Sequence, residues 1–189
     1  MKRGFKARAE ETAHDIRQKL GLERGSPLCP WKLADHLSIT VFTPSDLPLA
    51  ANDLNQLTEV DSGSWSGLTI RESGLTAVVL NPTHSRPRQR STLMHEIAHV
   101  YLDHVGNRVD VSQDGVLLVS DYSPEQEDEA NWLAGALLAP REALLAACEA
   151  GMSAPDICKQ YGISSDLCTW RLRMTGVEMQ LRHRRRKAS

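Results

Sequence analysis

The segment His95–His99 reads HEIAH, a pair of histidines four residues apart with a glutamate after the first. It lies in the run STLMHEIAHVYLDH, whose apolar residues recur at helical spacing over a length too great for a strand. We therefore predict a helix over residues 91–104, with Ser91 as its candidate N-cap. Side chains four residues apart lie one above the other on a helix, so both imidazoles can reach one metal ion from the same face.

The residues between and around the two histidines are apolar, which indicates that this helix is buried and that its polar residues have a purpose. Glu96 lies beside the histidines and can contact a water on the metal rather than the metal itself, which suits a catalytic base. The competing interpretation is a surface helix with two ordinary histidines, because so short a pattern also arises by chance.

A second predicted helix begins after Ser123-Pro124 and ends at Pro140, and its first turns are acidic. Glu127 is one turn before Asn131, so Glu127 can bind the metal while Asn131 hydrogen-bonds a ligand histidine. Glu129 is the alternative carboxylate ligand. Two histidines and one carboxylate, with water in the fourth position, form the open coordination of a catalytic zinc site. Zinc is the default metal for this pattern, and the ligand types alone also suit manganese or iron.

The remaining elements indicate helices, then a small sheet, then helices, which is an α+β order. Residues 43–63 are rich in Pro, Asp, Asn and Ser and are predicted to be a loop, with room for one short turn of helix. We divide the chain into a domain over residues 1–140, a helical region over 141–180 and a basic tail over 181–189 that we expect to be disordered. The predicted helices are 7–20, 30–37, 141–151, 154–162 and 164–176, and the predicted strands are 38–42, 65–71 and 76–81, the last two forming a hairpin.

The motif RQRSTLMHEIAHVYLDH followed by EDEANWLAGALLAP resembles the ImmA/IrrE-type metallopeptidase family, over roughly residues 16–140. The resemblance implies a zincin-like minimal metallopeptidase with His95, His99 and Glu127 as metal ligands and Glu96 as catalytic base. It also implies zinc-dependent hydrolysis of a specific protein, such as a helix-turn-helix transcriptional repressor of a mobile element or a stress regulon.

The sequence departs from the family pattern at three positions. Leu133 stands where the family usually has Phe, Ala139 where it usually has Met, and Ser91 where an aromatic residue is common. All three changes concern packing, so they affect details of the core rather than the chemistry.

Several nearby side chains are secondary candidates for the same site. Asp103, one turn beyond His99, either orients a ligand from behind or is a solvated carboxylate at the helix end. His104, Tyr101 and Tyr122 are candidates for stabilising an oxyanion. The strand over 76–80 precedes the metal helix and is expected to offer an edge for pairing with an extended substrate.

A second class of function rests on the C-terminal part. Residues 156–176 resemble a helix-turn-helix, with a glycine turn, a serine cap and a second helix bearing Arg171 and Arg173. This class is a DNA-binding or partner-binding regulator with a structural or regulatory metal. The competing interpretation is a helical hairpin packed on the core, because the same helix also carries an apolar face.

Charge is unevenly distributed along the chain. The 22 basic and 24 acidic residues give a formal charge of −2, but residues 182–187 hold five Arg or Lys, which leaves 17 basic against 24 acidic residues elsewhere. The body is thus acidic and suited to a cation, and the basic tail suits weak contact with nucleic-acid phosphates. The N-terminus lacks the apolar stretch of a signal peptide, no run is long enough for a membrane span, and no CxxC occurs, so we expect a cytoplasmic protein.

Overall fold

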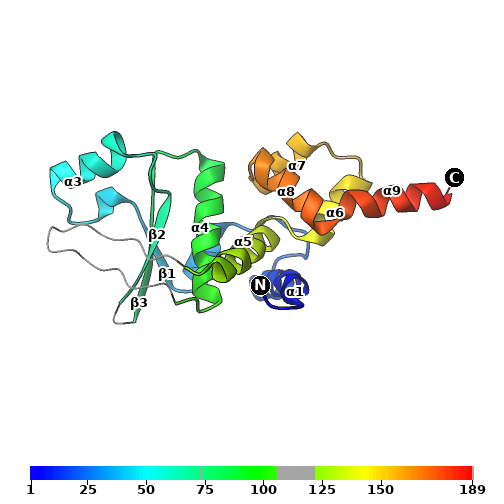
Figure 1. The fold of residues 1–189 in the computed structure, drawn as a ribbon, viewed down its shortest axis with the longest axis horizontal. Coiled ribbons are helices and arrows are strands. Elements are labelled where there is room, and N and C mark those ends of the chain that lie inside the picture. Colours follow the sequence, from blue (N-terminus) through cyan, green and yellow to red (C-terminus); the bar gives the residue numbers. More distant parts are fainter. Residues whose placement is uncertain (73, 106–121, 189) are drawn as a thin grey trace.

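The computed structural model describes residues 1–72, 74–105 and 122–188, and within these ranges the chain forms a three-stranded sheet and nine α-helices. Figure 1 shows the sheet at one end of the molecule, α4 and α5 in the middle and the C-terminal helices at the other end. The predicted α+β class is therefore confirmed. The elements are α1 (Phe5–Lys19), α2 (Pro30–His36), β1 (Ile39–Phe42), α3 (Ala51–Asn55), β2 (Gly67–Glu72), β3 (Leu75–Leu80), α4 (Arg86–Tyr101), α5 (Pro124–Leu138), α6 (Arg141–Glu149), α7 (Ala154–Tyr161), α8 (Ser165–Thr175) and α9 (Val177–Ala188).

The sheet has the order β1-β3-β2, with β1 parallel and β2 antiparallel to β3. The predicted hairpin of β2 and β3 is confirmed, although Ser73 in its connection lies outside the described residues. The expectation that residues 76–80 offer a free edge is wrong, because β3 is the central strand and pairs on both sides. Its residues Ala77–Leu80 are buried between those neighbours and α4.

The segment over 43–63 is more helical than expected. It contains a short 3₁₀ turn (Pro44–Asp46), then α3, and then a π-helical turn (Gln56–Val60). None of the residues of α3 or of the π turn is buried. Because no apolar stripe marks these turns, hydrophobic periodicity does not reveal them.

Helix α4 begins five residues earlier than predicted, with Ser85 rather than Ser91 as N-cap. Pro87 lies in the first turn, where a backbone N–H would have no acceptor within the helix. Proline therefore costs no helical hydrogen bond there, and the residues before Ser91 can belong to α4. The start of α5 is confirmed: Ser123 accepts a hydrogen bond from the Gln126 backbone N–H, and the Gln126 side chain accepts one from the Ser123 N–H.

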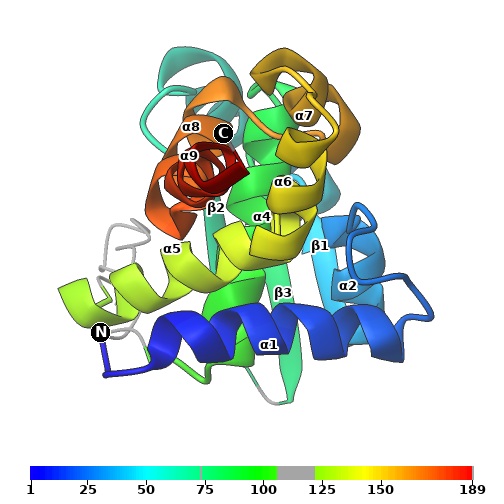
Figure 2. The ribbon, with the colours of Figure 1, turned by 90° about the vertical axis from the view of Figure 1, so that its right-hand side faces the viewer.

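The core joins the two ends of the chain. Figure 2 shows α1 lying along α5, and one hydrophobic cluster includes residues of α1, α4, α5 and the C-terminal helices. The guanidinium of Arg171 in α8 is fully buried, where it pairs with Glu10 of α1 at 2.6 Å and donates to the Ala139 carbonyl at 3.0 Å. Helix α8 is thereby held against the body, in line with the helical-hairpin interpretation, through a side chain that the helix-turn-helix interpretation would place on a DNA-facing surface.

The C-terminal tail differs from the expectation of disorder. Helix α9 continues through Ala188 and projects from the body in Figure 1. Its first residue, Val177, is fully buried, and Arg184 forms an ion pair with Glu149 of α6. Packing against α6 and α8 thus starts a helix that the basic composition alone does not predict. Within the described part of the chain, no helix is both long and apolar enough to cross a membrane.

Candidate metal centre

The three predicted ligands converge at the contact between α4 and α5. His95 and His99 lie one turn apart on α4, and their Nε2 atoms are 3.0 Å apart. Glu127, in the first turn of α5, places Oε2 3.3 Å from Nε2 of His95 and Oε1 3.5 Å from Nε2 of His99. One ligand atom from each residue lies within 4.8 Å of the others. Two imidazole nitrogens and a carboxylate oxygen at this spacing match the donor set of a zinc-type site.

The site is closed on one side and open on the other. The His99 side chain is fully buried, whereas those of His95 and Glu127 are 24% and 40% exposed. Burial, reinforced by the neighbouring His95 and His104, lowers the pKa of His99 to about 3. His99 is therefore neutral at physiological pH and keeps a ring nitrogen lone pair, as a metal ligand must.

Glu96 lies beside the predicted ligands, and a residue of the sheet hydrogen-bonds to its carboxyl group. Its Oε2 accepts a hydrogen bond from the hydroxyl of Thr69 on β2, at 2.5 Å. Burial raises the pKa of Glu96, and the Thr69 hydrogen bond partly opposes that rise. The carboxyl group is thus brought toward the range in which it can both accept and return a proton. Sequence reasoning missed Thr69, because only the pairing of sheet and helix brings this strand residue to the site.

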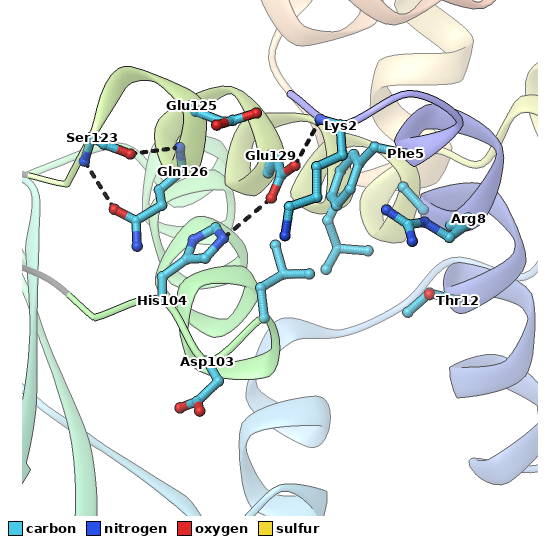
Figure 3. A pocket seen from close by; sticks show the side chains of 13 residues that line it. Lys2, Phe5, Arg8, Thr12, Asp103, His104, Ser123, Glu125, Gln126 and Glu129 are labelled. Atoms are coloured by element: carbon cyan, nitrogen blue, oxygen red, sulfur yellow. Dashed lines mark hydrogen bonds and ion pairs between the residues drawn. The ribbon is translucent and has the colours of Figure 1, made fainter.

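A second network lies behind His99, and Figure 3 shows its part from His104 through Glu129 to Lys2. Nδ1 of His99 is 3.1 Å from Nδ1 of His104, and Nε2 of His104 is 3.6 Å from Oε2 of Glu129. Glu129 also accepts a hydrogen bond from the Lys2 backbone N–H at 3.1 Å. Glu129 therefore faces His104 and α1 rather than the convergent Nε2 atoms, while Glu127 takes the position predicted for the third ligand. His104 is on the Nδ1 side of His99, so its expected role at an oxyanion is wrong.

The expected role of Asn131 is corrected. Asn131 is exposed and lines a hollow with Asp128 and Trp132, because the stripe of α5 that is buried in the core runs through Ala130 and Ala134 instead. It is therefore not the hydrogen-bond partner of a ligand histidine.

The structure supports the solvated interpretation of Asp103. Its side chain is 91% exposed and forms an ion pair with Arg71 of β2, with Asp103 Oδ1 3.1 Å from Arg71 Nη1. The same arginine donates to the Val100 carbonyl at 2.9 Å, which fastens the end of α4 to the sheet. Asp103 thus acts on the helix end and not on a ligand.

The two tyrosines differ in their relation to the site. The ring of Tyr122 stacks on that of His99, with centroids 3.6 Å apart and planes 22° apart, and burial raises the pKa of its hydroxyl. Tyr101 is exposed at the end of α4. Tyr122 is therefore the candidate of the two that remains next to the ligands.

A helix carrying HExxH, a carboxylate from the following helix and a buried glutamate beside them define a metallopeptidase-like site. The chain belongs to peptidase family M78, whose model, described as the IrrE N-terminal-like domain, matches residues 53–172. The match includes both α4 and α5 and confirms the resemblance to ImmA/IrrE-type peptidases. A search of curated proteins found no match.

Proposed function

We propose that this protein is a zinc-dependent endopeptidase with a zincin-like active site on α4 and α5. The observation that carries the proposal is the convergence of His95, His99 and Glu127 beside the buried carboxyl group of Glu96. Membership of the M78 family supports peptidase chemistry independently of this geometry. The three ligands leave a fourth position for water, as catalytic zinc sites require.

When bound, the metal activates a water molecule and polarises the scissile carbonyl as a Lewis acid. Glu96 takes the proton from the attacking water and delivers it to the leaving amine, a role that contributes typically about 10²–10⁴-fold to the rate. Thr69 holds the carboxyl group in place during both transfers. The closed face formed by His99 and Tyr122 limits solvent to the side on which His95 and Glu127 are exposed.

The sheet suggests how a peptide reaches this site. Among the described residues β2 pairs only with β3, so its other edge is the one that faces away from the sheet. Thr69 on β2 contacts Glu96, which places this strand beside the catalytic carboxyl group. An extended substrate that adds to the edge of β2 would therefore have its backbone fixed next to the metal ligands.

The proposed substrate is a specific protein, and the family resemblance favours a helix-turn-helix transcriptional repressor. The alternative function is a DNA-binding or partner-binding regulator in which the metal is structural. Burial of Arg171 weighs against that alternative, because a recognition helix needs its basic side chains at the surface. Of the two arginines in α8, only Arg173 is exposed. The basic residues of α9 are suited at most to weak phosphate contacts.

The test incubates the purified, zinc-loaded full chain with the product of a neighbouring gene as the candidate repressor substrate. Cleavage into two fragments is expected, with loss of activity on chelation and recovery when zinc is restored. An intact repressor together with salt-dependent binding of the full chain to duplex DNA would instead support the regulator. The matched control is the same repressor with its cleavage site changed to proline at the residue after the scissile bond.

A further inference from the structure

The contacts behind His99 form a chain of three side chains that leads away from the ligand cluster. Nδ1 of His99 meets Nδ1 of His104 at 3.1 Å, and Nε2 of His104 meets Oε2 of Glu129 at 3.6 Å. His104 and Glu129 are 8% and 7% exposed. Burying polar groups costs free energy unless they are paired, so these three side chains are expected to have a role besides packing.

The direction of the chain follows from the chemistry of the ligand. In the proposed site His99 coordinates through the lone pair of Nε2, so its proton must be on Nδ1. Nδ1 of His99 then donates, and Nδ1 of His104 must accept. A neutral His104 that accepts at Nδ1 carries its proton on Nε2, which is the atom that faces the carboxylate of Glu129. Each contact therefore determines the tautomer of the next ring.

Glu129 is itself fixed from the other side. Its Oε1 accepts a hydrogen bond from the Lys2 backbone N–H, while its backbone belongs to the second turn of α5. Figure 3 shows the carboxylate between His104 and Lys2, with one oxygen toward each. The same helix that supplies ligand Glu127 thus also supplies the end of the chain behind His99.

We propose that His104 and Glu129 are positioning residues that fix the tautomer and ring orientation of His99 and so raise the affinity of the site for zinc. This inference rests on the proposed metal site and deepens it. Outer partners of this kind typically account for about 10- to 100-fold in metal affinity. The structure thereby assigns a role to Glu129, a residue that sequence reasoning considered only as a rival ligand.

The surroundings allow the pair to be changed without crowding. Both residues line a cavity of about 480 Å³ together with residues of α1, α5 and the end of α4 (Figure 3). Side chains of similar or smaller size therefore fit at both positions. His104→Leu removes both polar contacts, His104→Asn keeps an acceptor near the position of Nδ1, and Glu129→Gln keeps an acceptor oxygen without its charge.

The experiment measures the zinc affinity of each full-length variant by competition with a chromophoric chelator. His104→Leu is expected to bind zinc about 10- to 100-fold more weakly than wild type. His104→Asn should recover most of that loss, and Glu129→Gln should fall between the two. Asp128→Asn, on the exposed side of α5, is the matched control for loss of one negative charge and should leave the affinity unchanged.

A second readout follows the tautomer directly. In ¹⁵N spectra of the zinc-loaded protein, Nδ1 of His99 should carry a proton in wild type, and its signal should broaden or shift in His104→Leu. Wild-type affinity in both His104→Leu and Glu129→Gln would overturn the inference, as would an equal loss in Asp128→Asn. If His104→Leu does not fold, Glu129→Gln decides: a zinc affinity below those of wild type and Asp128→Asn supports the inference, and wild-type affinity overturns it. A wild-type protein that binds no zinc would instead overturn the proposed metal site itself, and the inference with it.

Discussion

Replacing Thr69 by valine tests how the sheet supports the carboxyl group of Glu96, the proposed catalytic base. Valine has nearly the shape of threonine, so the change removes the 2.5 Å hydrogen bond to Glu96 and little else. A hydrogen bond to a charged group contributes about 1.5–3 kcal/mol. If that stabilisation is used to hold Glu96 in its working position, kcat/KM should fall about 10- to 100-fold, since about 1.4 kcal/mol corresponds to a factor of ten.

The pH dependence of the variant has a definite sign. In the proposed mechanism Glu96 acts as a base only when it is ionised, and the Thr69 hydrogen bond lowers its pKa. Without that bond the pKa rises further above its ordinary value, so the acidic limb of the kcat/KM profile should move to higher pH. The assay is cleavage of a fluorogenic peptide from pH 5 to 9, with zinc content and melting temperature measured in parallel.

Thr69→Ser keeps the hydroxyl and should retain most of the activity. Thr40→Val, on the exposed face of β1, is the matched control for a threonine change on a strand and should behave as wild type. An unchanged kcat/KM and pH profile in Thr69→Val would refute the assignment of Thr69 to Glu96. A loss of bound zinc in that variant would show that the strand acts on the ligands instead.

Two further predictions concern how the C-terminal helices are held to the body. Glu10→Ala leaves the buried guanidinium of Arg171 without its carboxylate, so the free energy of unfolding should fall by about 3–5 kcal/mol in urea denaturation. In Gly135→Ala the new Cβ would lie 2.7 Å from Trp170 and 2.9 Å from Arg171, and overpacking should cost about 1–3 kcal/mol in the same measurement.

Both predictions have matched controls. Glu11→Ala removes an exposed carboxylate from the same helix and should leave stability nearly unchanged. Gly25→Ala adds a Cβ no closer than 3.8 Å to its neighbours and should be tolerated. Wild-type stability in Glu10→Ala would mean that water reaches Arg171, and a stable Gly135→Ala would mean that α8 shifts to accommodate the methyl group.

The cluster of His95, His99 and Glu127 could be predicted from sequence because the spacing of these residues is local. His95 and His99 need only a helix to share a face, and Glu127 needs only the helix that follows. Their neighbours were harder to predict. Asn131 or Asp103 was expected to contact a ligand histidine, whereas the residue that contacts His99 is His104. The backbone turns at Asp103, with φ of 52°, and so brings His104 back behind the His99 ring. Helical periodicity says nothing about residues beyond the helix end.

The sheet shows a similar division. The composition of residues 65–81 was sufficient to predict two strands and their hairpin. The strand order depends on the pairing of β3 with β1, and no local sequence pattern predicts that pairing. The continuous apolar run Ala77–Leu80 was nevertheless a usable signal, because a strand buried on both faces has this pattern rather than alternation. The burial of Arg171 could not be predicted from local sequence, because it depends on an ion pair with Glu10 near the other end of the chain.

In the proposed active site Glu96 is the catalytic base beside a metal held by His95, His99 and Glu127. The most direct test measures zinc content and peptide cleavage in Glu96→Gln alongside Glu127→Ala. Glu96→Gln should keep stoichiometric zinc and lose at least about 10²-fold in cleavage rate, whereas Glu127→Ala should lose both. Cleavage by Glu96→Gln at the wild-type rate, or stoichiometric zinc in Glu127→Ala, would contradict these roles.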